Sequence, residues 1–166
     1  MKMAYGQWFH KLMSAMSWSK DLSAWNEIFS KSLISCPDGE RAHREWLSFL
    51  GSDLATLLLQ HGYSTLRELR IDLPKTVRGF ESQRFGVIDL CFFDHPNDRC
   101  WLVDWKTTKD FDQMHPSGMS SYFKKLWCYK EAVAQSLNIT VFPSLYFSSN
   151  AKWVTSSELM PQEQKG

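Results

Sequence analysis

Residues 86–107, GVIDLCFFDHPNDRCWLVDWKT, decide the fold of this chain. Two apolar runs flank the polar segment DHPNDR (94–99), whose residues favour turns, so the stretch predicts two antiparallel strands with a tight connection. Yet Asp89, Asp104 and Lys106 stand in the most apolar parts of these runs, where core residues are expected. The hairpin therefore predicts a sheet that carries charged groups for a reason other than packing.

The rest of the chain predicts helices, three strands, a helix and a final strand or two, which is an α/β fold with a mixed central β-sheet flanked by helices. Ser52 or Asp53 is expected to cap a helix that stops at Gly62. Helical spacing predicts helices over residues 6–18, 22–34 and 41–62, the last of which could be one helix or two. An alternating pattern predicts a strand from residue 65. We expect a loop over 111–121, a helix over 121–137 and a final strand or two over 139–149.

The length of 166 residues predicts a single domain with a mainly helical part (about 1–62), a sheet and helix (63–150) and a tail (151–166). Hydrophobic residues make up 43%, which is enough for a substantial core and excludes a disordered chain. No run of 18 apolar residues and no secretory leader is found, so we expect a cytoplasmic protein without a membrane span.

The net charge of +1 is lower than that of most proteins that bind nucleic acid on their own. Any contact with nucleic acid would then use a local groove or depend on delivery by another protein. The four cysteines are spread without a CxxC pair, so we expect free thiols and no iron–sulfur cluster.

The charged residues of the hairpin can form a site. Residues two apart in a strand point to the same face, so Asp104 and Lys106 project together, and pairing through the turn brings Asp89 to the same end. Two carboxylates in an apolar setting repel each other unless a cation such as Mg²⁺ or Mn²⁺ compensates. A lysine beside them could orient a water molecule or stabilise a phosphate. The same spacing also permits a plain salt bridge of Asp104 with Lys106 or an arginine at the rim of the sheet.

Four segments in order, GQWFH, GVIDL, VDWKT and KLWCY, resemble the PD-(D/E)XK nuclease superfamily, and within it the RecB/AddA branch. That branch forms the C-terminal nuclease domain of UvrD/Rep-like recombinational-repair helicases and shows G-x-x-x-H, G-x-I-D, D-[YFW]-K-T and Q-x-x-x-Y motifs. The resemblance covers about residues 5–148 and implies a restriction-endonuclease-like core. It also implies an Mg²⁺-dependent deoxyribonuclease, expected to be an exonuclease acting on single-stranded DNA or ends, with a helicase in cis or in trans.

The resemblance assigns roles to residues of this chain. His10, Asp89, Asp104 and the backbone carbonyl of Trp105 would be metal ligands, and Lys106 would be the catalytic lysine. In this assignment the two aspartates serve both metal binding and catalysis.

Further positions are implied around this set. Tyr129 would lie near the DNA backbone, and Glu68 matches an acidic position on the preceding strand. Lys125 stands where the family has glutamine, and there it would contact phosphate as a charge. The segment GERAH (39–43) also spells G-x-x-x-H, so His43 is a rival to the metal-binding histidine of the first motif.

Two alternatives remain open from the sequence. One is a catalytically weak or inactive DNA-binding or scaffolding module of the same fold, which the Lys125 departure favours and the intact charged residues oppose. The other is a different nuclease of the superfamily, such as a CRISPR adaptation or phage nuclease. Members of that kind with an iron–sulfur cluster need a C-terminal cysteine group that this sequence lacks.

Overall fold

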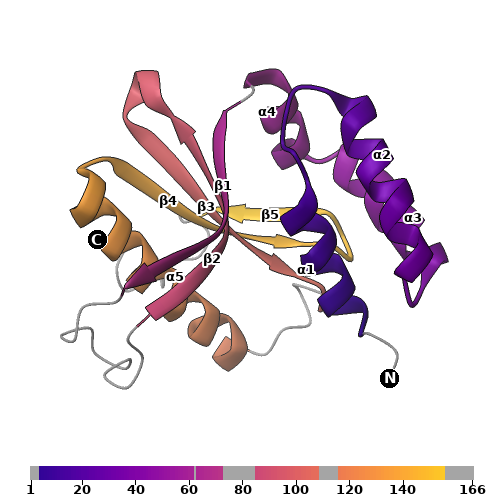
Figure 1. The fold of residues 1–166 in the computed structure, drawn as a ribbon. Helices are drawn as coiled ribbons and strands as arrows, with labels where there is room; N and C mark the ends of the chain where they lie inside the picture. Colours follow the sequence, from indigo (N-terminus) through magenta and orange to yellow (C-terminus); the bar gives the residue numbers. More distant parts are fainter. Residues whose placement is uncertain (1–3, 62, 73–84, 109–115, 156–166) are drawn as a thin grey trace. The chain divides into compact units, whose positions relative to one another are not determined.

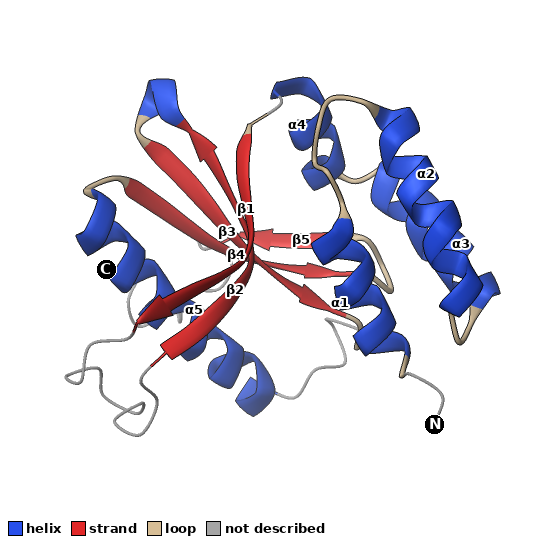
Figure 2. Cartoon of the chain, viewed as in Figure 1, coloured by secondary structure: helices blue, strands red, loops and turns tan. Residues whose placement is uncertain are grey.

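The computed structural model describes residues 4–61, 63–72, 85–108 and 116–155, and the statements that follow concern these residues. Figures 1 and 2 show their helices and strands. The helices are α1 (Tyr5–Ala15), α2 (Leu22–Ser32), α3 (Gly39–Leu50), α4 (Asp53–His61) and α5 (Pro116–Leu137), with 3₁₀ turns η1 (Leu33–Ser35) and η2 (His95–Asn97). The strands are β1 (Ser64–Asp72), β2 (Phe85–Asp94), β3 (Arg99–Lys106), β4 (Thr140–Phe147) and β5 (Lys152–Thr155).

The five strands form one sheet in the order β1–β2–β3–β4–β5. β1 pairs antiparallel with β2, and β2 pairs antiparallel with β3. The backbone N–H of Thr140 donates to Asp98 (2.9 Å), and that of Ser148 donates to Lys106 (2.8 Å). Both bonds join residues with the same separation in sequence, which is the pattern of a parallel pair, and helix α5 makes the crossover that such a pair needs. The predicted α/β class with a mixed sheet is therefore confirmed.

The chain forms two compact units, each described here by itself. Of the described residues, the first unit comprises 4–61, 63, 105–108 and 146–153, and the second comprises 64–72, 85–104, 116–145 and 154–155. The first unit thus contains helices α1–α4 and the second contains α5 with most of the sheet residues.

An aromatic cluster forms the core of the first unit. The rings of Trp18 and Trp25 meet edge to face at 5.2 Å, and Trp18 stacks on Trp105 at 5.8 Å. Trp105 also meets Tyr146 at 5.6 Å, and Phe49 meets Tyr146 at 5.4 Å. Such edge and offset contacts are the favourable arrangements of buried rings. The cluster anchors the side chain of Trp105 among the helices.

The helix ends of the first unit follow from local polar groups and from this cluster. Ser52 accepts a hydrogen bond from the Ala55 N–H (3.2 Å), so of the two expected caps of α4 it is the serine that acts. Gly62, the expected stop, lies outside the described residues. Helix α1 ends at Ala15, not at residue 18, because Met16 takes an extended backbone (ψ 136°). Trp18 then takes φ 49° and buries its indole in the cluster.

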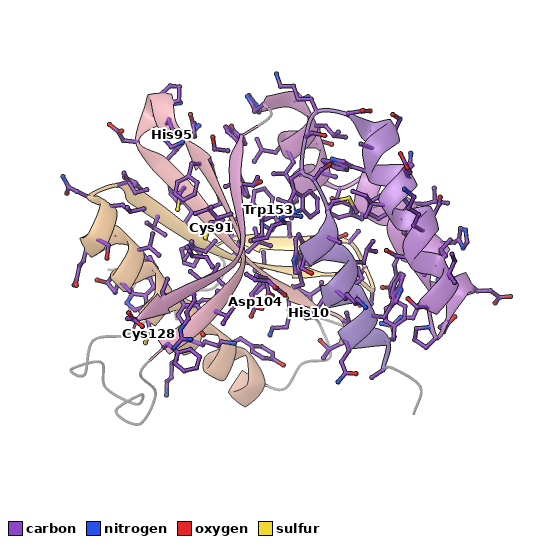
Figure 3. The ribbon with its side chains drawn as sticks, viewed as in Figure 1. His10, Cys91, His95, Asp104, Cys128 and Trp153 are labelled. Atoms are coloured by element: carbon purple, nitrogen blue, oxygen red, sulfur yellow. The ribbon has the colours of Figure 1, made fainter. Side chains whose placement is uncertain are left out.

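Helix α5 covers the core of the second unit. Ile88, Cys91, Leu102, Val133 and Val141 belong to one buried cluster formed by the sheet and this helix. Cys100 and Cys128 lie in the same cluster, and Figure 3 labels Cys91 and Cys128. All three thiols are free, and burial raises the pKa of Cys100 to about 12. These cysteines therefore act as small apolar core residues.

Two expectations at the chain's C-terminal half are wrong. Helix α5 begins at Pro116, within the segment 111–121 that we expected to be a loop, because proline has the backbone angle and missing N–H that suit a first helical position. A fifth strand, β5, lies in the segment 151–166 that we expected to be a tail, after a turn in which Ala151 takes φ 52°. Among the described residues, no helix has the length and apolarity needed to cross a membrane.

Strand β1 has a backbone irregularity at Glu68. Its pairing with β2 runs through Arg67–Leu90 and Leu69–Ile88 in one register, but Glu68 between them has φ 49°. Continuing that register places Glu68 opposite Asp89. A left-handed conformation costs a residue with a Cβ roughly 1–2 kcal/mol, and Asn tolerates it better than most. Strain is thus stored beside the strand position that carries Asp89.

We expect Glu68→Asn to raise the free energy of unfolding by about 1 kcal/mol, because asparagine enters the left-handed region more readily than glutamate. Urea unfolding would measure the change. Arg67→Asn, at the exposed neighbouring position, is the control and should lower stability, because asparagine disfavours regular strands. Equal losses from both substitutions would contradict the strain at Glu68.

Candidate active site

The hairpin of β2 and β3 places two carboxylates together in the second unit. Its register runs from Asp94–Arg99 to Leu90–Val103, and one further step puts Asp89 opposite Asp104. Residues opposite one another on antiparallel strands point to the same face. Both side chains are half-buried, and the Oδ2 atom of Asp104 lies out of reach of solvent. Figure 3 labels Asp104 on β3.

Tyr129 of α5 lies beside this carboxylate pair, Asp89 and Asp104. Its ring packs against Gly86 so closely that a Cβ on the glycine would overlap the ring. The pKa of Tyr129 is raised, and burial is the largest cause. The negative charge of Asp104 is the second cause, and that of Asp89 makes a smaller contribution in the same direction. A hydrogen bond from the Val87 backbone acts in the opposite direction. The phenol group therefore sits in the electric field of both carboxylates.

A lysine flanks the same place. Lys125, one helical turn before Tyr129, has its ammonium group 5.7 Å from the centre of the tyrosine ring, and its side chain is half-buried. A cation at this distance from a ring is attracted by the negative face of the π system. The helix thus brings a hydroxyl and a positive charge to the surroundings of the carboxylate pair.

The pair of carboxylates, Asp89 and Asp104, has the ligands expected for a magnesium ion and not those of a structural zinc site. Within the part of the chain that the structure describes, no cluster of three or more His, Cys, Asp or Glu side chains could hold a metal. Structural zinc would need such a cluster. Mg²⁺ is instead commonly bound by one or two carboxylates together with water and substrate phosphates. The donor set of Asp89 and Asp104 therefore fits a hard cation that shares its coordination with a substrate.

Lys106 and Trp105 belong to the end of β3 in the first unit. The Lys106 carbonyl accepts the hydrogen bond from Ser148 that joins β3 to β4, and its side chain is half-buried. The Trp105 side chain is 1% exposed and fills the aromatic cluster, so only its backbone is left for the ligand role. That role of the carbonyl stays a prediction.

The two candidate histidines differ in their surroundings within the first unit. His10 lies on α1, one turn after Gly6, and residues four apart share a helix face. A Cβ on Gly6 would come within 2.9 Å of the Thr107 hydroxyl oxygen, so α1 packs closely on the residue that follows Lys106. The position of His10 relative to the carboxylate pair stays a prediction.

His43 is exposed on α3. One of its ring nitrogens lies 2.9 Å from the carbonyl oxygen of Gly39 in the same helix, and its ring meets that of Phe29 edge to face at 5.5 Å. These contacts are those of a helix-surface residue. Within the first unit, His10 therefore shares a helix face with Gly6, which lies close to Thr107 at the end of β3. The contacts of His43 are instead with Gly39 and Phe29.

No family model matches this chain, and no curated protein matches it. The arrangement of residues is therefore the basis for any functional proposal.

Gly86 is a site residue whose role the sequence does not reveal. Its position in the G-x-I-D pattern marks it, but that pattern gives no sign that the glycine touches Tyr129, which lies 43 residues further along the chain. Glycine is used where another group must approach the backbone closely. The contact ties the β2 strand to α5 next to the carboxylate pair.

We expect Gly86→Ala to lower the free energy of unfolding by about 1–3 kcal/mol, because the new methyl group overlaps the Tyr129 ring. With Tyr129→Ala in the background the same change should be neutral or slightly stabilising, since the clash is gone and alanine suits a strand better than glycine. Denaturant titrations of the four proteins give this cycle. Gly39→Ala, where a Cβ meets nothing within 4 Å, is the control. Additive effects would contradict the contact.

We expect Asp104→Asn to lower the pKa of Tyr129 toward the ordinary value of about 10, because it removes a charge that raises it. NMR of ¹³C-tyrosine, assigned with Tyr129→Phe, would measure the titration. Since the pKa is raised in the folded protein, its contribution to stability is complete below about pH 10 and is lost as pH rises through the folded-state value. The wild type should therefore lose more stability than the variant in alkali. Asp98→Asn, in the turn at the other end of the hairpin, should leave the Tyr129 pKa unchanged, and an equal shift in both variants would refute the proximity.

Proposed function

We propose that this chain is a metal-dependent DNA nuclease of the PD-(D/E)XK type. The observation that carries the proposal is the β2–β3 register, which sets Asp89 opposite Asp104 with Lys106 two residues further along the same strand. Metal-dependent hydrolysis of a phosphodiester uses a bound cation and a neighbouring group that orients the attacking water. Two carboxylates and a following lysine offer these components.

The architecture supports a restriction-endonuclease-like core. Three antiparallel strands are followed by helix α5 and a strand parallel to β3, in a mixed sheet preceded by helices. The sequence pattern predicts this order of helices, three strands, a helix and a further strand.

The roles follow from the chemistry of each side chain. Asp89 and Asp104 would hold Mg²⁺, or Mn²⁺ in its place, which would polarise a phosphoryl oxygen and stabilise negative charge as the bond breaks. Lys106 would orient the attacking water by hydrogen bonding. His10 would complete the ligand set from α1, together with the Trp105 carbonyl.

Tyr129 and Lys125 would contact the DNA backbone. The Tyr129 phenol is protonated near neutral pH, so its hydroxyl can donate a hydrogen bond to a phosphate oxygen. Lys125 adds a positive charge on the same side of α5. The substrate would be single-stranded DNA or DNA ends, supplied by a helicase in cis or in trans, since the net charge of +1 offers little general attraction to DNA.

The second candidate function is a DNA-binding module without cleavage. Lys125 favours it, because a lysine near Tyr129 can bind phosphate without assisting catalysis. A metal distinguishes the two candidates: a working site gains thermal stability from millimolar Mg²⁺ through binding to the folded state, and a decayed site does not.

The decisive experiment is cleavage of end-labelled single-stranded and duplex DNA with Mg²⁺, Mn²⁺ or EDTA. We expect metal-dependent cutting by the wild type, loss of cutting in Asp104→Asn, and a decrease of about 10²-fold to 10³-fold in Lys106→Ala with metal binding retained. Asp98→Asn, in the hairpin turn, should cut like the wild type. Normal cutting by Lys106→Ala would refute its role. The absence of cutting with any metal, together with tight DNA binding, would favour the binding module.

A further inference from the structure

Three successive carbonyl groups at the end of β3 are each held by a different partner in the first unit. The Lys106 carbonyl accepts from the Ser148 N–H at 2.8 Å, the Thr107 carbonyl from a guanidinium nitrogen of Arg41 at 2.8 Å, and the Thr108 carbonyl from the Ser149 hydroxyl at 3.0 Å. Only the first is a bond of the sheet ladder. Strand ends usually fray, so this degree of attachment beyond the last strand residue is a specific feature.

Arg41 is itself fixed by a part-buried network. Its Nε donates to one oxygen of Glu45 at 2.7 Å, and the Tyr5 hydroxyl donates to the other at 2.9 Å. The guanidinium also lies over the Tyr5 ring, 3.9 Å from its centre. Glu45 is 5% exposed, and both oxygens of this buried carboxylate accept a hydrogen bond. The planar fork of arginine makes these contacts at once, and a lysine cannot reproduce them.

The network of Arg41, Glu45 and Tyr5 specifies one backbone geometry, which apolar packing alone would not do. Buried ion pairs add little net stability, because desolvation of both charges offsets their attraction, but they can specify one geometry. Here the geometry is that of the backbone directly after Lys106. Gly6 of α1 adds a close contact with the Thr107 side chain, so helices α1 and α3 both contact this one residue.

We propose that Arg41 is a positioning residue that fixes the backbone of residues 106–108 and thereby aims Lys106. The catalytic consequence rests on the proposed nuclease function, whereas the structural part stands without it. Arg41 acts through Thr107, and Glu45 and Tyr5 hold Arg41 in place.

Hydrogen exchange tests the structural part without any activity. The Ser148 amide reports the bond to Lys106, and the Thr140 amide, bonded to Asp98, reports the other end of the same strand pair. In Arg41→Met, and in the milder Arg41→Lys and Glu45→Gln, we expect exchange at Ser148 to rise at least about tenfold while exchange at Thr140 stays unchanged.

The matched control is Lys31→Met, which breaks another ion pair between residues four apart, Lys31 with Glu27, on the exposed surface of α2. It should alter neither amide. Unchanged exchange at Ser148 in all Arg41 and Glu45 variants would overturn the proposal, and so would an equal rise at both amides, which would mean general destabilisation.

Kinetics test the catalytic part. The Arg41 variants should lower kcat by about 10-fold to 100-fold with KM for DNA unchanged, because a misaimed lysine affects the chemical step and not binding. Faster exchange at Ser148 with normal kcat would overturn this part. If the wild type proves inactive, the nuclease proposal fails, while a local rise in exchange at Ser148 would still support the fixing of the strand end by Arg41.

Discussion

The antiparallel register of β2 and β3 is the constraint on which the candidate site depends. It sets Asp89 against Asp104, although like charges opposite each other destabilise a sheet. Helix α5 lays Tyr129 against Gly86, where burial and the charges of Asp104 and Asp89 raise the pKa of its phenol group.

The hairpin was predictable because its signals are local. The turn DHPNDR, the apolar runs on both sides and the period of two suffice to pair the strands, and the pairing brings Asp89 to Asp104. The start of α5 at Pro116 could have been found from the preference of proline for a first helical turn. Strand β5 has only four residues, and so short a segment carries too little pattern to be recognised.

The contacts that surround the candidate residues were not predictable in the same way. Gly86 and Tyr129 meet across 43 residues, and Arg41 reaches Thr107 across 66 residues. Nothing in a helix sequence such as GERAHREW distinguishes an arginine that binds a distant carbonyl from one that faces solvent. The same segment drew attention to His43, which proves to contact its own helix and Phe29. Motif spacing identifies candidate side chains, whereas the contacts that support them depend on tertiary packing.

The supports of Asp104 and Lys106 are of two different kinds, although only Trp105 separates these residues. Pairing with β2 defines the place of Asp104, and the network of Arg41, Glu45 and Tyr5 defines the backbone after Lys106. The period of a strand directs both side chains to one face but does not hold the last residue of the strand still. Helix α3 supplies such a hold from outside the sheet, because Arg41 binds the Thr107 carbonyl while its part-buried ion pair with Glu45 contributes geometry more than energy.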